Sequence, residues 1–317
     1  MRRPLRLLLA TGLLLPALVA CGDDGGSSGD DGAETALQGF EAVSVSGEPG
    51  SEPTIEWEGE MVAEELEVQV VSEGDGPEIA SGDFVIAEIV LGNGFTQETV
   101  YSTYDEGRTP EVVQASDQLT PALVAALEGQ TVGSRVAVVA PPEEAFGEQG
   151  NPALGIGNAD SVLFVVDLVS PVLDGPRGEE RDAPAGAPEV VEQDGAVTGL
   201  DFAAGARPTG ELEVTTLVEG DGPAVEGPEA FVAVDYLGQV FGGDEPFDES
   251  YSSGQPVGFS LGGVVEGWTR GLDGVTVGSR VLLEIPSELG YGEQGQPSAG
   301  IEGGDTLVFV IDVLGTA

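Results

Sequence analysis

The residue types that most often carry out catalysis are nearly absent from this 317-residue chain. It has no His and a single Cys, Cys21, and all ten of its basic residues are Arg. Catalytic triads with His, Cys–His pairs, internal disulfides and Lys Schiff bases are therefore excluded. Carboxylates could bind Ca²⁺, but no D-x-[DN]-x-[DN]-G loop with its closing Glu occurs. We expect neither a metal nor a cofactor, and any enzymatic activity must work without an imidazole or a thiolate.

The chain is strongly acidic, with 57 Asp and Glu against 10 basic residues and a net charge of −47. A chain of this charge repels phosphate backbones, so we expect no binding to nucleic acid. The acidity is typical of a solvated surface that favours solubility. The alternative is an acidic docking surface for a basic partner.

The lone cysteine, Cys21, follows a short apolar segment. Basic residues at positions 2, 3 and 6 precede the apolar stretch 7–20, which is shorter than the roughly 20 apolar residues that span a bilayer. This pattern indicates a secretory signal peptide, and its end, LVAC at 18–21, matches the bacterial lipobox. We therefore predict a signal peptide over 1–20, acylation of Cys21 and a flexible acidic tether over 21–39. The alternative is an ordinary signal peptide with an incidental Cys.

The rest of the chain consists of two copies of one repeated unit. Four blocks recur in order: EGDGP at 73–77 and 219–223, TVGSRV at 131–136 and 276–281, FGEQGNP at 146–152 with YGEQGQP at 291–297, and DSVLFVVDLV at 160–169 with DTLVFVIDVL at 305–314. The offsets are 146, 145, 145 and 145 residues. Nearly constant spacing over about 100 residues predicts a duplicated domain, because solenoid repeats are shorter. We divide the chain into domains at 40–170 and 189–317 and a Pro- and Gly-rich linker at 171–188.

The residue pattern of each copy predicts mainly β structure with one helix. In the second copy, short apolar runs predict strands at 211–218, 231–237, 281–285 and 307–314. The segment 264–272 carries apolar residues at helical spacing, and its counterpart 121–127 is rich in Ala and Leu. We expect an α+β fold in which one helix lies across an antiparallel sheet.

Over about residues 208–317, the chain resembles the FKBP family of peptidyl-prolyl isomerases. The matching segments, in order, are EGDGP, VDYLG at 234–238, FDES at 247–250, VVEGW at 264–268, VGSRVLLEIPSELGYG at 277–292 and DTLVFVIDVL. The resemblance implies two FKBP-like domains, each a twisted antiparallel sheet of five or six strands wrapped around a short helix. It also implies a ligand site between the helix and the sheet.

The family's site carries over to the second copy residue by residue. The resemblance implies that Trp268 forms the floor beneath a substrate proline ring and that Asp248, bonded to Tyr236, faces the substrate carbonyl. Further site positions would be Phe247 and Phe309 as aromatic walls, Val264 and Val265 on the helix side, Tyr291 as a hydroxyl donor and Ile301 at one edge. Three positions depart from the family pattern: Ser253 replaces its usual Arg, Gln296 its His and Glu302 its Pro.

The first copy keeps the repeated blocks but loses these polar and aromatic groups. By the offsets, Val90 corresponds to Tyr236, Tyr101 to Phe247, Ser102 to Asp248, Leu123 to Trp268 and Phe146 to Tyr291, whereas Ile156 and Phe164 are retained. We therefore expect the first copy to keep the fold and to have little or no activity.

The sequence as a whole predicts a peptidyl-prolyl cis-trans isomerase whose active site lies in the C-terminal domain. It would act on proline-containing segments of exported proteins, held by the lipid on Cys21 at the extracytoplasmic face of the cell membrane. The Arg-only, Gly- and Ala-rich composition suggests an actinobacterial source. The alternative function is a non-catalytic chaperone or peptide-binding module on the cell surface.

Overall fold

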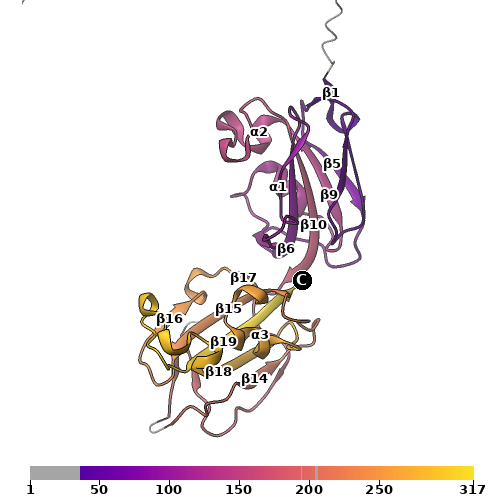
Figure 1. The fold of residues 1–317 in the computed structure, drawn as a ribbon. Coiled ribbons are helices and arrows are strands. Elements are labelled where there is room, and N and C mark those ends of the chain that lie inside the picture. Colours follow the sequence, from indigo (N-terminus) through magenta and orange to yellow (C-terminus); the bar gives the residue numbers. More distant parts are fainter. Residues whose placement is uncertain (1–35, 194, 204–205) are drawn as a thin grey trace, which may run out of the picture. The chain divides into compact units, whose positions relative to one another are not determined.

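The computed structural model describes residues 36–193, 195–203 and 206–317. The predicted signal peptide, Cys21 and most of the predicted tether lie outside these residues. The described chain is largely β structure, arranged as two main antiparallel sheets, each with one short helix packed on it. The predicted α+β fold is therefore confirmed (Figure 1).

The first domain is built on a six-stranded sheet of order β5-β9-β10-β6-β7, with β8 also paired to β6. The strands are β5 (Glu67–Ser72), β6 (Phe84–Asn93), β7 (Glu98–Ser102), β8 (Glu111–Gln114), β9 (Arg135–Ala140) and β10 (Val162–Val172). Helix α1 (Pro121–Leu127) packs on β9 and β10, and α2 (Pro142–Ala145) follows β9. The hydroxyl of Thr120 accepts a hydrogen bond from the Leu123 N–H and caps α1, and Pro121 suits the first helical position.

The second domain repeats this sheet in the order β11-β14-β18-β19-β15-β16, with β17 paired to β15. The strands are β11 (Glu179–Glu180), β14 (Glu213–Glu219), β15 (Phe231–Val240), β16 (Pro246–Glu249), β17 (Val257–Ser260), β18 (Arg280–Ile285) and β19 (Leu307–Thr316). Helix α3 (Glu266–Leu272) packs on β18. All four predicted strands and both predicted helices are present, and the short strand β11 brings this sheet to seven strands.

Both faces of each sheet are covered, which explains why the central strands are continuous apolar runs. In β19, Phe309 and Ile311 face the core beneath α3, whereas Val308 and Val310 belong to a separate buried cluster on the opposite face. A hairpin before each sheet covers that opposite face. The hairpins are β2 (Val43–Ser46) with β3 (Thr54–Trp57), and β12 (Glu189–Gln193) with β13 (Ala196–Asp201).

A buried ion pair holds the first hairpin against its sheet. The Arg135 side chain is fully buried, and its Nε lies 2.6 Å from Oδ1 of Asp167 on the neighbouring strand. The guanidinium also donates to the carbonyl oxygens of Ser46 and Ser51, which flank the hairpin turn. Tyr104 donates its hydroxyl to Oδ2 of Asp167 at 2.5 Å. The repeated TVGSRV block thus supplies a structural anchor, and Arg280 with Asp312 repeats it in the second domain.

Two predicted connecting segments contain regular structure. The predicted tether includes residues 36–39, but Leu37–Gln38 form β1, which pairs in parallel with β4 (Met61–Val62) because Leu37 packs against an apolar cluster. The predicted linker spans residues 171–188, but β10 continues to Val172 and Glu179–Glu180 pair with β14. In addition, the backbone N–H groups of Leu173 and Arg177 donate to Leu314 and Gly278.

Candidate active site

A cavity of about 420 Å³ lies in the second domain beside α3. Its lining comes from β15, β16, β17, the start of α3, the loop before β19 and β19 itself. The lining residues are Tyr236, Phe247, Asp248, Phe259, Gly263, Val264, Val265, Trp268, Tyr291 and Phe309. An apolar cavity with a few polar groups is typical of a small-ligand site.

Trp268 stands at the centre of the aromatic lining. Its ring centroid lies 5.5 Å from that of Tyr236, 5.5 Å from that of Phe259 and 5.3 Å from that of Phe309. All three pairs are edge-to-face, the arrangement that aromatic quadrupoles favour. Trp268 is 3% exposed, and its indole N–H has no hydrogen-bond partner among the described residues. Because a buried unpaired donor is costly, an acceptor on a bound ligand would stabilise this site.

Tyr236 and Asp248 provide the polar part of the cavity. The Tyr236 hydroxyl donates to Oδ2 of Asp248 at 2.7 Å, as the resemblance implied. Burial, followed by this hydrogen bond to the Asp248 carboxylate, raises the pKa of Tyr236 above its ordinary value. The phenol is therefore a stable neutral donor. Ser253, at the position of the family's Arg, donates instead to the carbonyl oxygens of Ser250 and Gln255.

The absence of a side chain at Gly238 makes room for the two phenylalanine walls. A Cβ at this position would meet the Phe309 ring at 2.5 Å and the Phe247 ring at 2.6 Å. These rings lie edge-to-face with centroids 5.6 Å apart. Gly238 therefore determines where the walls stand.

Replacing Gly238 by Ala is expected to displace these rings and to lower ligand affinity about tenfold, the equivalent of roughly 1.4 kcal/mol. Calorimetric titration with a proline peptide measures the effect. Gly199→Ala is the matched control, since its Cβ would meet only Gln239 Oε1, at 3.7 Å. Equal affinity of the Gly238 variant and the unaltered protein would contradict this assignment.

The structure brings together eight of the nine site residues predicted from the sequence. The exception is Ile301, which is 1% exposed and belongs to the core beneath the cavity without lining it. Phe259 and Gly263 also line the cavity, although neither is among the residues predicted from the sequence. Alternation could not have identified Phe259, because Val257, two residues away on the same face of β17, is exposed.

Strand register corrects the correspondence between the two copies. Phe309 pairs with Gly238, and its counterpart Phe164 pairs with Leu91, so Leu91 is the equivalent of Gly238. The offset over this strand and the next is therefore 147 residues. The counterparts of Tyr236, Phe247 and Asp248 are Ile89, Val100 and Tyr101, and the predicted Val90, Tyr101 and Ser102 are wrong by one residue.

The corrected alignment explains why the first domain has no equivalent aromatic and acidic lining. The side chain of Leu91 is nearly buried in the core where Gly238 leaves space, and Leu123 replaces the flat ring of Trp268. Tyr101 turns its hydroxyl to Glu111 instead, with the Arg108 guanidinium 4.4 Å from its ring centroid. Burial and the bond to Glu111 raise the pKa of Tyr101 to about 12.

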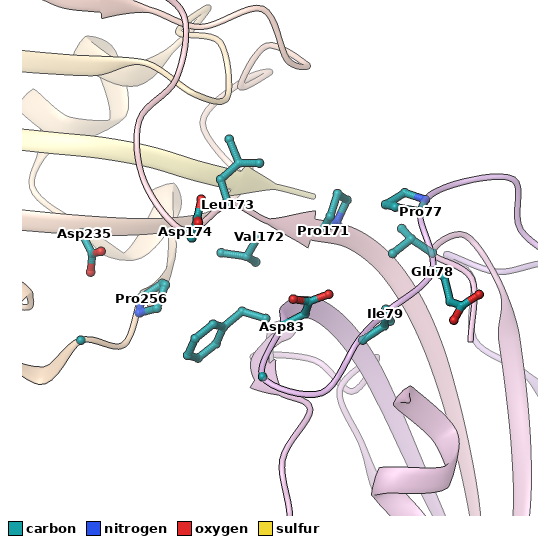
Figure 2. A pocket seen from close by; sticks show the side chains of 14 residues that line it. Pro77, Glu78, Ile79, Asp83, Pro171, Val172, Leu173, Asp174, Asp235 and Pro256 are labelled. Atoms are coloured by element: carbon teal, nitrogen blue, oxygen red, sulfur yellow. The ribbon is translucent and has the colours of Figure 1, made fainter. Parts of the chain in front are cut away.

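A second cavity of about 420 Å³ has a different lining (Figure 2). Its walls include Pro77, Ile79 and Pro171, with the carboxylates of Asp83 and Asp174, and no Trp or Tyr. Its lining has one aromatic residue, Phe84, and lacks the cluster of rings that surrounds Trp268. Among the described residues, no group of three or more His, Cys, Asp or Glu could hold a metal ion. Within the same residues, no helix has the length and apolar character that crossing a membrane requires.

The second domain thus combines an antiparallel sheet, a short helix and an aromatic cavity between them. Residues 76–169 and 223–314 each match the family of FKBP-type peptidyl-prolyl cis-trans isomerases. The chain belongs to this family and contains two of its domains in tandem.

Curated relatives agree with this assignment. The chain is 39% identical over 117 residues to the FK506-binding protein of Streptomyces anulatus, covering 36% of this chain and 93% of that protein. It is 46% identical over 83 residues to the FKBP-type peptidyl-prolyl cis-trans isomerase FkpA of Escherichia coli strain K12, covering 26% of this chain and 30% of that protein. The crystal structure of FkpA from Escherichia coli matches with 39% identity, coverage of 33% and 47%, and a TM-score of 0.31.

Proposed function

We propose that the second domain is the catalytic domain and that it isomerises X-Pro bonds in exported proteins. The observation that carries this proposal is the cavity in which Trp268, Phe309 and the Tyr236–Asp248 pair meet. The first domain keeps the sheet, the helix and Phe164, but it has Ile89, Tyr101 and Leu123 in place of Tyr236, Asp248 and Trp268. This contrast supports a scaffold or peptide-binding role for the first domain.

The chemistry requires no proton transfer. Rotation about a peptide bond has a barrier of about 18–20 kcal/mol because resonance holds the amide planar. The planar amide is more dipolar than the twisted one, so a dry aromatic site disfavours the planar ground state. Trp268 and Phe309 would hold the proline ring, and the polar pair would orient the rotating carbonyl. Each 1.4 kcal/mol or so of preference for the twisted amide raises the rate about tenfold.

Turnover of a chromogenic X-Pro tetrapeptide by residues 35–317, which form one compact unit, tests the proposal. The Asp248→Asn variant is expected to lower kcat/KM about tenfold, because the hydrogen bond from Tyr236 then ends on a neutral acceptor. Glu213→Gln, on β14, which does not line the cavity, is the control. Unchanged activity of the Asp248 variant, or loss of activity on Tyr101→Phe in the first domain, would show that the active site is not the cavity of the second domain.

The rate is expected to be level between about pH 7 and pH 9, since tyrosine ordinarily titrates near pH 10 and the chain has no His. The pKa of Tyr236 is raised, so its hydroxyl remains protonated across this interval and is lost as a donor only at higher pH. A pH profile of kcat/KM measures this. An inflection inside the interval would show that another group controls turnover.

We further propose that the protein is an acylated, extracytoplasmic lipoprotein of an actinobacterium. The lipobox ending at Cys21 and the acidic segment after it support this. Mass spectrometry of the membrane fraction is expected to find diacylglycerol on Cys21, and Cys21→Ala is expected to release the protein. A soluble, unacylated protein would contradict the proposal.

Peptide binding without catalysis is the second candidate function, and the first domain's retained fold favours it. If the isolated second domain is produced to test this, it has to begin near residue 171. A start at 189 would remove β11 and the hydrogen bonds from Leu173 and Arg177. Binding of a proline peptide with no turnover would establish this second function.

A further inference from the structure

We infer that the cavity of the second domain selects proline segments that carry Arg or Lys beside the proline and disfavours segments with Asp or Glu there. This inference rests on the proposed isomerase function of the domain. It concerns the charge of the substrate, which the fold of the family does not determine.

The segments that form the cavity also carry exposed carboxylates. Glu266 directly follows the lining residue Val265, and its side chain is 54% exposed. Tyr291 belongs to a loop in which every charged residue is acidic. The exposed carboxylates on or next to these segments include Asp244, Glu245, Asp248, Glu266, Glu288, Glu293 and Glu302.

One basic side chain, Arg270, offsets one of these charges, and the other carboxylates have no Arg partner among the described residues. Residues 206–317 contain three Arg, at 207, 270 and 280, and none of them lines it. Arg270 pairs with Glu266, one turn away on the same helix. Arg280 points to the opposite face of the sheet, where it is 14% exposed and bonded to Asp312 and Glu192. The field at the cavity is therefore negative.

A second, independent feature indicates that a peptide occupies this cavity. The indole N–H of Trp268 is buried and unpartnered within the described part of the chain. A peptide carbonyl would satisfy this donor, and the proline ring would cover the aromatic floor. The side chains on either side of the proline in such a peptide would then extend towards the exposed carboxylates around the cavity, which form its acidic rim.

Charge selection of this kind depends on distance and salt. The Debye length is about 30 Å at 0.01 M ionic strength and about 3 Å at 1 M, so rim carboxylates act on a bound cation only at low salt. Converging charges of one sign around a low-dielectric cavity raise the local concentration of the opposite charge. The effect is expected mainly in KM, because it acts on encounter and binding more than on amide rotation.

The experiment compares blocked tetrapeptides with Lys, Leu or Glu before the proline as substrates of residues 35–317. At about 0.01 M ionic strength we expect kcat/KM for the Lys peptide to exceed that for the Glu peptide about tenfold, and at about 1 M less than twofold. The triple variant Glu266→Gln, Glu293→Gln, Glu302→Gln is expected to reduce the low-salt ratio to about threefold. The triple variant Glu213→Gln, Asp221→Asn, Glu226→Gln removes the same charge from segments that do not line the cavity and is expected to leave the ratio unchanged.

Equal rates for the Lys and Glu peptides, a ratio that persists at high salt, or an equal response to both triple variants would each overturn the inference. Absence of turnover with the Leu peptide would instead overturn the proposed isomerase function. In that case calorimetric titration with the same peptides measures the charge preference directly, and equal affinities for Lys and Glu would refute it.

Discussion

Replacing Trp268 by Leu is expected to lower kcat/KM for an X-Pro peptide about 30-fold, the equivalent of roughly 2 kcal/mol of lost transition-state binding. The indole lies edge-to-face with three other rings of the cavity and forms its flat floor. Leu keeps the site apolar but offers no planar surface to a proline ring. It also removes the unpartnered N–H, so both the shape and the polarity of the floor change.

Trp57→Leu is the matched control, because Trp57 is the only other tryptophan of the chain and packs on the hairpin side of the first sheet. It is expected to leave kcat/KM unchanged. Circular dichroism of both variants separates loss of the site from loss of the fold. Full activity of a folded Trp268→Leu protein would show that the cavity beside α3 is not the active site.

Truncating the buried anchor of the first domain is expected to have the largest effect on stability. The Asp167→Ala variant leaves the fully buried guanidinium of Arg135 without its carboxylate. Breaking a buried ion pair in this way costs about 3–5 kcal/mol, because an uncompensated charge remains in the core. Urea unfolding measures the loss. In a Trp268→Phe background, Trp57 becomes the only tryptophan and reports on the first domain alone.

Two further variants test the reason for this effect. The double variant Arg135→Met, Asp167→Leu removes both charges, so it is expected to recover much of the lost stability. Arg181→Ala breaks an exposed pair with Glu219, whose side chains are 44% and 55% exposed, and is expected to cost less than about 1 kcal/mol. If Asp167→Ala is no more destabilising than Arg181→Ala, the buried pair does not anchor the first hairpin.

The duplication, the fold class and most of the site could be predicted from the order of the amino acids. Local sequence signals for the start of a helix were strong where two of them coincided. Thr120 and Pro121 mark the start of α1, and the structure begins the helix at Pro121 as predicted. Because the motifs of the second copy occur in family order, the sequence also identified Trp268, Tyr236 and Asp248 before any contact was known.

The strand register of the first copy, in contrast, could be read only from the folded domain. Ile89, Val90 and Leu91 are all apolar and buried, because β6 is covered by α1 on one face and by a hairpin on the other. A slip of one residue therefore leaves the apolar pattern unchanged, although it exchanges the two faces. The pairing of Phe164 with Leu91 resolves this ambiguity.

The pattern of apolar residues likewise did not predict the hairpins or the strand β11. Glu179–Glu180 is a charged segment with no apolar alternation, and it becomes a strand because the edge of β14 is free to bond it. Ile301 and Phe259 are both apolar residues in loop or edge segments, yet only Phe259 lines the cavity. Which of them does so depends on how the loop before β19 and the strand β17 pack against α3, and this packing is a property of the assembled domain.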